Sequence, residues 1–208
     1  MARPPVQPAF RKRPGSLSLP GCPPLFGISS YDGAKNICAE KFDQRIGALI
    51  ETKQIKKVFL IAFWSMYTEG EPNNQPNHFI SDAQTSSHDS ASSKLVITRQ
   101  LQEMIRRMNE NGIEVVIVHS VPILPKVVQD LSVDFTQPFA KIQQQNQFME
   151  DFVRQRKGAG LTAIDPTGAF CDAQVCQARI DGNVLYSDNN HISAAAAARL
   201  IKLIETAL

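Results

Sequence analysis

An aspartate and a histidine, Asp188 and His191, stand three residues apart near the C-terminal end of the sequence. A histidine titrates close to neutral pH, so its imidazole can take a proton from a nucleophilic hydroxyl group. A neighbouring carboxylate can hold that imidazole in one tautomer and stabilise its charged form. These are the residue types that a hydrolase or acyl-transferring enzyme needs beside its nucleophile. The spacing alone is a weak signal, because an aspartate that caps a helix beside a surface histidine gives the same pattern.

The segments on either side of this pair indicate how it would be held. Residues 184–186 are predicted to form a short strand, and residues 192–208 have the alanine-rich, apolar pattern of a helix. A turn between a strand and a helix would carry both side chains on one rigid loop. The pair could then act as a unit, with the aspartate orienting the histidine.

The composition favours a single globular domain. The chain has 208 residues, of which 43% are hydrophobic and 20% charged, which allows a sizeable core. A net charge of +2 gives no electrostatic case for nucleic acid as a partner. No apolar run approaches the ~18 residues of a membrane-spanning segment, and the basic, proline-rich start of the chain lacks the apolar core of an export signal. We expect residues 1–20 to be irregular and residues 21–208 to form the domain.

Helix and strand patterns alternate along the domain. Two continuous apolar runs, residues 58–63 and 113–118, are typical of strands that are buried on both faces of a parallel sheet. Helix patterns precede them at residues 39–53 and 93–111, and such connections suit right-handed crossovers. We predict an α/β fold, a three-layer sandwich with a mostly parallel, flavodoxin-like sheet. The two apolar runs should be adjacent or near-adjacent central strands.

Aromatic and histidine side chains follow the two predicted strands at their carboxyl ends, where open α/β sheets carry their sites. Trp64 and Tyr67 follow the first run and could stack on a ligand ring, with packing in the core as the alternative. His119 follows the second run, where a partly buried, hydrogen-bonded histidine is the simpler interpretation.

A polar segment over residues 69–93 is predicted to be a long loop, and long loops are often functional. It contains side chains that could bind a metal, namely His78, Asp82, His88 and Asp89. Solvated loop residues explain this composition better. We therefore predict no metal site and no cofactor.

The four cysteines form two local pairs, Cys22 with Cys38 and Cys171 with Cys176. Four cysteines allow three pairings, of which two local loops are the simplest, and four reduced thiols are the alternative. A zinc site fits poorly, because the spacings do not resemble paired C-x-x-C ligands. Disulfides would imply an oxidising compartment. That compartment conflicts with the missing export signal, unless the chain is part of a longer exported protein.

Three features together resemble a known family. They are Trp64 in the turn after the first apolar run, the Val121-Pro122 turn after the second, and Leu185–Ser193 before the last helix, which reads LYSDNNHIS. Such a chain resembles an SGNH hydrolase. It is most similar to the SGNH domain fused behind membrane acyltransferase-3 proteins, which O-acetylate polysaccharides of the bacterial envelope. The resemblance covers roughly residues 21–208 and is most specific at the D-x-x-H segment.

This resemblance implies an esterase or O-acetyltransferase in which a serine attacks an acyl ester, His191 acts as general base and Asp188 orients it. The acyl group would pass to water or to a sugar hydroxyl, with Trp64 and Tyr67 contacting the sugar. The partners would be an acyl donor and a sugar acceptor, reached through a membrane acyltransferase-3 domain. The paired cysteines fit the same subgroup, and the implied location is the periplasm or cell envelope.

The nucleophile of the family has no counterpart in this sequence. In the family it sits in a G-D-S turn after the first strand, and no such strand and turn precede Cys22. We therefore expect a truncated domain without its first strand, nucleophile and first helix, with Ser65 as the first candidate for a substitute nucleophile. The alternatives are a non-catalytic carbohydrate-binding relic, or an unrelated flavodoxin-like binding module with a coincidental D-x-x-H.

Overall fold

The structure is a computed structural model of the 208-residue chain. It describes residues 17–18, 21–30, 37–51, 55–70, 78–124, 135–156, 158 and 160–205. Within these ranges, no helix has both the length and the apolar character needed to cross a membrane.

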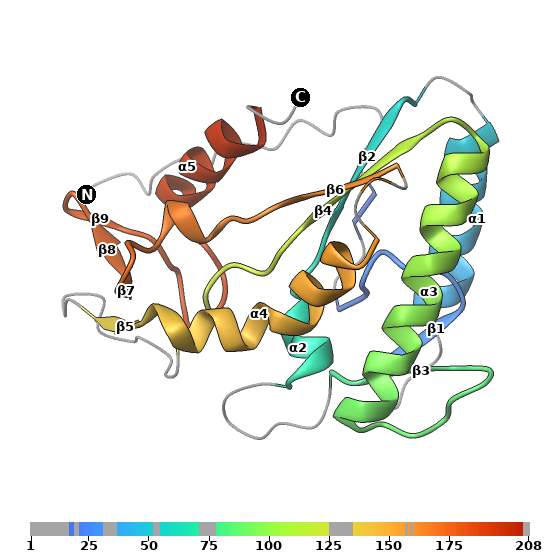
Figure 1. Cartoon of the computed structure of the whole chain (residues 1–208), viewed down its shortest axis with the longest axis horizontal. Coiled ribbons are helices and arrows are strands. Elements are labelled where there is room, and N and C mark those ends of the chain that lie inside the picture. Colours follow the sequence, from blue (N-terminus) through green and yellow to red (C-terminus); the bar gives the residue numbers. More distant parts are fainter. Residues whose placement is uncertain are drawn as a thin grey trace, which may run out of the picture.

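A parallel three-stranded sheet forms the centre of the fold (Figure 1). Its strands are β2 (Lys57–Ile61), β4 (Glu114–Val118) and β6 (Leu161–Ile164), in the order β2-β4-β6. β2 pairs with β4 over five residues, and β4 pairs with β6 over four. The predicted parallel α/β fold with adjacent apolar strands is confirmed. One part of the prediction is wrong, because only β4 is central and β2 lies at the edge of the sheet as described.

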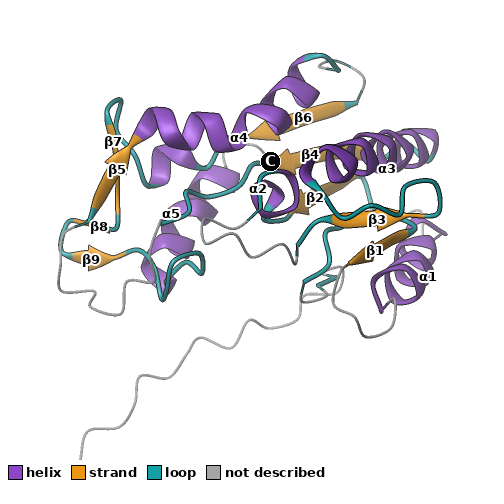
Figure 2. Ribbon diagram, turned by 90° about the horizontal axis from the view of Figure 1, so that it is seen from below, coloured by secondary structure: helices purple, strands orange, loops and turns teal. Residues whose placement is uncertain are grey.

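Helices on the first face of the sheet enclose the main hydrophobic core (Figures 1 and 2). They are α1 (Ile37–Glu51), α3 (Ser90–Glu110) and α4 (Phe139–Arg154). The fully buried side chains of this core include Leu101, Met104, Val115 and Ile117. Alternating residues of β4 enter this core, as the two-residue period of a strand requires.

The second face of the sheet carries a smaller apolar cluster under the C-terminal helix α5 (Ala194–Glu205). Leu203 and Ile204 of α5 pack against the cluster that contains Val116 and Ile164. Helices therefore cover both faces, which gives the predicted three layers.

The longest helix, α3, has clear start and stop signals in the sequence. Asp89 caps its first turn, where its carboxylate accepts a hydrogen bond from the backbone N–H of Ser92 at 2.8 Å. The chain leaves the helix at Asn111 and Gly112, and Gly112 takes a φ of 69° that suits glycine. The buried face of α3 consists of Ser93, Val96, Ile97, Leu101, Met104, Ile105 and Met108. The predicted helix over residues 93–111 is confirmed with a start three residues earlier.

Short elements complete the fold. They are β1 (Ile28–Ser30), α2 (Trp64–Thr68), β3 (Ile80–Asp82), β5 (Thr136–Pro138), η1 (Thr167–Ala169), β7 (Val175–Gln177), β8 (Arg179–Ile180) and β9 (Asn183–Val184). β1 pairs with β3, β5 with β7 and β8 with β9, all antiparallel. Because β3 and the start of α3 fall within residues 69–93, the predicted long loop is in part regular structure.

Two disulfides join the cysteines in the local pairs that the sequence favoured. Cys22 is bonded to Cys38, with their Cα atoms 5.6 Å apart, and Cys171 is bonded to Cys176. The first disulfide attaches the segment before β1 to the start of α1, and the second closes the hairpin turn before β7. The alternative of four reduced thiols is therefore wrong.

Candidate active site

The turn before α5 is built on one carboxylate. Asp188 Oδ1 accepts hydrogen bonds from the backbone N–H groups of Asn190, at 2.8 Å, and His191, at 2.7 Å. Asp188 Oδ2 lies 2.7 Å from His191 Nδ1, so the same side chain forms the turn and holds the imidazole. Contact through Nδ1 leaves Nε2 for proton exchange, and the His191 side chain is 78% exposed. The structure thus brings the two predicted side chains into direct contact.

The environment of Asp188 favours its ionised form. Burial raises the pKa of its carboxyl, but hydrogen bonds from the backbone of His191 and Asn190 and from the His191 ring outweigh burial and lower the pKa below its usual value. At neutral pH the side chain is therefore a carboxylate. This is the form that can accept a hydrogen bond from Nδ1–H and orient the ring.

Contacts with distant segments anchor this turn. The buried Tyr186 donates a hydrogen bond from its hydroxyl to the carbonyl of Pro122, at 3.0 Å. The backbone N–H of Leu124 donates to the carbonyl of Asn189, at 2.9 Å. Pro122 and Leu124 follow the carboxyl end of β4. These contacts therefore tie the Asp188–His191 turn to the end of the sheet where sites form in α/β folds.

A contact with α2 places the same turn beside the carboxyl end of β2. The side-chain amide of Asn190 points its Nδ2 at the sulfur of Met66, 4.0 Å away. In Figure 2, α5 and the strands β7, β8 and β9 gather at one end of the molecule, away from α1 and α3. The candidate site lies in the turn between β9 and α5.

The aromatic residues of α2 lie in the core instead of in the site. Trp64 is 0% exposed, and its indole Nε1 donates to the carbonyl of Val118 at 2.9 Å. Tyr67 is 6% exposed, and burial raises the pKa of its hydroxyl to about 12. Neither ring has a free face, so stacking on a sugar is wrong for this conformation. α2 turns both rings into the main core, where they contribute buried area.

The comparisons with known proteins identify the family. The sequence matches the family described as SGNH domain (fused to AT3 domains) over residues 11–206. The chain belongs to this family. It is therefore an acyltransferase- or esterase-type domain of a kind that is found fused to AT3 domains.

The fold of this SGNH domain is also found in a solved structure. The periplasmic domain of a lipopolysaccharide acetyltransferase from Salmonella ser. Paratyphi A is similar with a TM-score of 0.58 and 16% sequence identity. The match covers 89% of this chain and 68% of that chain. At this identity the likeness shows the fold alone. Among curated proteins, none matches the sequence significantly.

Ser65 does not present a nucleophile to the site of this SGNH domain. The residue is 2% exposed, and its hydroxyl has no hydrogen-bond partner in the structure. Its backbone N–H donates to Ser120 Oγ at 3.0 Å, and the carbonyl of Ser120 accepts from Asn146 Nδ2 at 3.0 Å. This network fixes α2 against α4. An acyl ester could not reach Ser65 unless that packing opened.

His119 is a buried histidine at the end of β4. It is 7% exposed, and burial lowers the pKa of its imidazole while the charge of Asp165 raises it in part. The Nδ1 atom of His119 has no hydrogen-bond partner in the structure. The predicted burial is therefore observed, but the predicted hydrogen bond is not observed at Nδ1. The ring is therefore part of the packing at the carboxyl end of β4.

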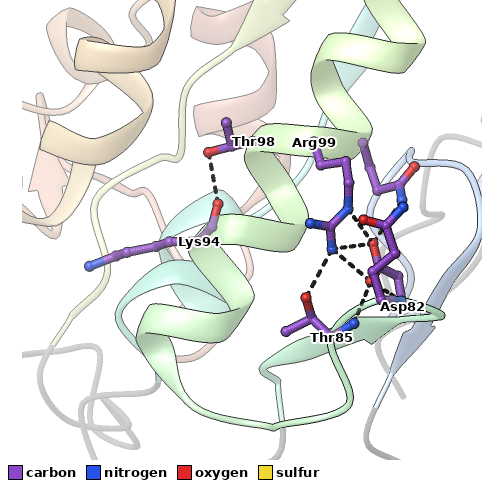
Figure 3. Close-up of polar contacts among 7 residues, drawn as sticks. Asp82, Thr85, Lys94, Thr98 and Arg99 are labelled. Atoms are coloured by element: carbon purple, nitrogen blue, oxygen red, sulfur yellow. Dashed lines mark hydrogen bonds and ion pairs between the residues drawn. The ribbon is translucent and has the colours of Figure 1, made fainter.

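Among the potential metal ligands of residues 69–93, Asp82, His88 and Asp89 have other partners, and Figure 3 shows those of Asp82. The carboxylate of Asp82 pairs with Arg99, whose Nε and Nη2 lie 2.9 and 2.7 Å from Oδ2. Asp89 caps α3, and His88 Nδ1 lies 3.2 Å from the carbonyl of Phe79. No cluster of metal-binding side chains occurs in the described part of the chain. Solvation of Asp82, predicted from the polar sequence, is wrong because its side chain is 3% exposed.

Sequence reasoning missed the residues that hold the Asp188–His191 turn. Tyr186, Asn189 and Asn190 lie inside or next to the D-x-x-H segment, but their partners are far away in sequence, and Tyr186 and Pro122 are 64 positions apart. The one signal that could have pointed to Tyr186 is a tyrosine directly after the apolar Val184 and Leu185, since a buried tyrosine hydroxyl requires an acceptor.

Proposed function

We propose that this SGNH domain carries the general-base half of an acyl-transfer site, with His191 as the base and Asp188 as the residue that orients it. The observation that supports this most directly is the 2.7 Å contact between Asp188 Oδ2 and His191 Nδ1 at the carboxyl end of a parallel sheet. The ionised carboxylate keeps the proton on Nδ1. Nε2 then carries the lone pair that accepts a proton from a nucleophile.

The chemistry divides into two transfers. A serine hydroxyl attacks the acyl carbon of an ester while His191 Nε2 removes its proton. The donor alkoxide then leaves and takes that proton from the imidazolium. A sugar hydroxyl or water attacks the acyl-enzyme in the second transfer, and His191 again takes and returns one proton. We propose that the serine is supplied by a segment outside this chain, because the sequence has no G-D-S turn and Ser65 is buried.

We further propose a cell-envelope polysaccharide as the acceptor and a location in the periplasm or envelope. The family is found fused to AT3 domains, and the similar solved structure is a periplasmic domain of a lipopolysaccharide acetyltransferase. The two disulfides support an oxidising compartment. A carbohydrate-binding relic is a weaker alternative, because Trp64 and Tyr67 are buried in the core. A coincidental D-x-x-H in an unrelated module disagrees with the family match.

The test is gain of activity. The 208-residue chain should hydrolyse aryl acetates only weakly, and a version with an upstream strand, G-D-S turn and helix should hydrolyse them well. His191→Ala should lower the restored activity by about three orders of magnitude or more, the usual effect of losing a general base. His88→Ala, which changes a histidine in another loop, is the matched control and should leave the activity unchanged. Strong hydrolysis by the chain alone, or restored activity that survives His191→Ala, would contradict the proposal.

A further inference from the structure

The segment that follows β4 holds the turn before α5 at two points. The carbonyl of Pro122 accepts a hydrogen bond from the Tyr186 hydroxyl at 3.0 Å, and the backbone N–H of Leu124 donates to the carbonyl of Asn189 at 2.9 Å. We call residues 122–124 the support segment. Because both contacts are made by its main chain, a shift of that main chain would move the turn.

A buried amide holds the middle of the support segment. Gln137 Nε2 donates to the carbonyl of Ile123 at 2.8 Å, and the two residues are 4% and 2% exposed. A carbonyl can only accept a hydrogen bond, so the nitrogen of the amide must face it and not the oxygen. Gln137 therefore fixes the carbonyl that lies between the two points at which the turn is held.

The main chain of Gln137 is itself fixed on both sides. Gln137 is the central residue of β5 and lies opposite Cys176 of β7, which is bonded to Cys171. The flanking residues Phe135 and Phe139 form backbone hydrogen bonds to the segment around β7, at 2.9 and 2.8 Å. The side chain of Gln137 therefore extends from a main chain that is held in place.

Packing alone does not explain a glutamine at this position. Thr136 and Pro138 are exposed, so the alternation of β5 turns the side chain of Gln137 inward. A buried amide costs free energy unless it is hydrogen-bonded, which an apolar side chain would avoid. The amide of Gln137 is bonded only in part, because its Oε1 has no partner in the structure. This favours a role in placing the Ile123 carbonyl over a role in stability.

We propose that Gln137 is a positioning residue for His191 and acts through the support segment. Its amide holds the Ile123 carbonyl, and this sets the main chain that contacts Tyr186 and Asn189. The position of His191 Nε2 relative to the nucleophile follows from these contacts. The inference rests on the proposed acyl transfer, since it concerns how the base of that reaction is held. A displacement of about 1 Å can cost a rate factor on the order of 10².

Native-state hydrogen exchange tests the support of the turn in the 208-residue chain. Gln137→Met removes the amide and keeps a side chain of similar length, and Gln137→Leu repeats the test with another apolar shape. In both, the N–H of Leu124 should exchange about tenfold faster or more relative to the N–H of Val115, because the support segment can open without global unfolding. The reference N–H of Val115 donates to the carbonyl of Gly160 in the sheet at 3.0 Å. An unchanged ratio would overturn the proposal.

Asn146→Leu is the matched control. Asn146 is also a buried amide, 3% exposed, and its Nδ2 donates to the carbonyl of Ser120 at 3.0 Å. This acceptor follows the same strand but lies before the support segment. Asn146→Leu should change the exchange of Leu124 and Val115 by the same factor, through global stability alone. A selective effect on Leu124 as large as that of Gln137→Met would remove the assignment to Gln137.

Kinetics test the effect on the base. The protein for this test is restored by adding an upstream strand, G-D-S turn and helix. There, Gln137→Met should lower kcat for aryl acetate hydrolysis by about 10–100-fold with little change in KM, because the base is misplaced while binding is kept. Rates are compared per folded molecule, as measured by circular dichroism. A merely structural role would lower the folded fraction and leave kcat per folded molecule unchanged, as Asn146→Leu should.

The inference and the proposed function can fail separately. If the restored protein loses its activity in His191→Ala but keeps it in Gln137→Met, the positioning role is wrong and the acyl-transfer proposal stands. If the restored protein lacks His191-dependent activity, the proposed function is wrong. The exchange of the Leu124 N–H then decides alone whether Gln137 holds the turn.

Discussion

Two turns of the molecule are built around aspartates in the same way. Asp82, at the end of β3, and Asp188, before α5, each use Oδ1 to accept hydrogen bonds from the backbone N–H groups two and three residues further along, at 2.7–3.0 Å. An aspartate that folds its own following residues in this manner is a common local turn. By itself this geometry says nothing about function.

The partner of the second carboxylate oxygen separates the two turns. Oδ2 of Asp82 binds the guanidinium of Arg99 and the amide of Gln100, and the Asp82 side chain is 3% exposed. Figure 3 shows Arg99 reaching from α3 to this carboxylate. Oδ2 of Asp188 instead contacts an imidazole, and the Asp188 side chain is 37% exposed. The first turn fixes a permanent ion pair in the structure, whereas the second holds a group that can exchange protons with solvent or substrate.

The largest expected effect is on catalysis and belongs to Asp188 alone. The protein to use is the one restored by adding an upstream strand, G-D-S turn and helix. In this restored protein, Asp188→Asn should lower the rate of aryl acetate hydrolysis by about 10³–10⁴-fold, because an amide can no longer enforce the Nδ1–H tautomer. Asp82→Asn should change the rate only as far as it lowers the folded fraction. Rates are compared per folded molecule, as measured by circular dichroism. Similar losses from both substitutions would remove the distinction between the turns.

The next effect is on stability and belongs to Asp82. Asp82→Asn leaves the partly buried guanidinium of Arg99 without its counter-charge, so the free energy of unfolding should fall by about 2–3 kcal/mol, somewhat less than for a fully buried pair. Asp188→Asn should cost no more than about 1 kcal/mol, because it removes interactions at a partly exposed site. Urea unfolding of the three proteins measures the difference. A larger loss for Asp188 would reverse the assigned roles.

A smaller effect is the dependence of stability on pH. Burial raises the pKa of the Asp82 carboxyl, but hydrogen bonds from Arg99, Gln100 and Gln84 and the charge of Arg99 outweigh it and lower the pKa. The folded protein then binds fewer protons than the unfolded chain, so this stabilisation is present above the unfolded pKa of about 3.9 and is lost as pH falls through the lower folded value. Unfolding at a series of acidic pH values should show this loss, and Asp82→Asn should flatten it. An unchanged slope would contradict the role of Arg99.

The smallest effect concerns a third turn of the same type. Asp172 Oδ1 accepts from the backbone N–H groups of Gln174 and Val175, both at 2.8 Å, inside the loop that the Cys171–Cys176 disulfide closes. This aspartate has neither the Arg99 nor the imidazole contact that marks the other two turns. Asp172→Asn should therefore change neither activity nor the urea midpoint measurably, and it serves as a control for both experiments. A measurable loss would mean that the turn geometry, and not the partner, carries the effect.

The sequence was informative where the interactions are local. The contact between Asp188 and His191 spans three residues, and the apolar run at 113–118 has the composition of a strand buried on both faces, as β4 is. The disulfides also close short loops. The run at 58–63 has a similar composition, but β2 is an edge strand, because local sequence does not record which neighbour a strand lacks.

The missed features depend on contacts between distant segments. The polar composition around Asp82 predicted a solvated loop, yet a guanidinium 17 residues away buries its carboxylate. Trp64 and Tyr67 lie in a helix of five residues, which is too short for periodicity to tell which side faces the core. The anchor from Tyr186 to Pro122 likewise depends on the tertiary fold.

The tautomer of His191 is the most direct test of the proposed role of its turn. If Asp188 holds the imidazole through Nδ1, the neutral ring carries its proton on Nδ1 and leaves Nε2 as the acceptor. Long-range ¹H–¹⁵N correlation spectra of histidine-labelled protein above neutral pH report this directly, and His191→Gln assigns the signal among the four histidines. We predict the Nδ1–H form in the wild-type chain and its loss in Asp188→Asn. An Nε2–H form in the wild-type chain would contradict the assignment of His191 as the general base.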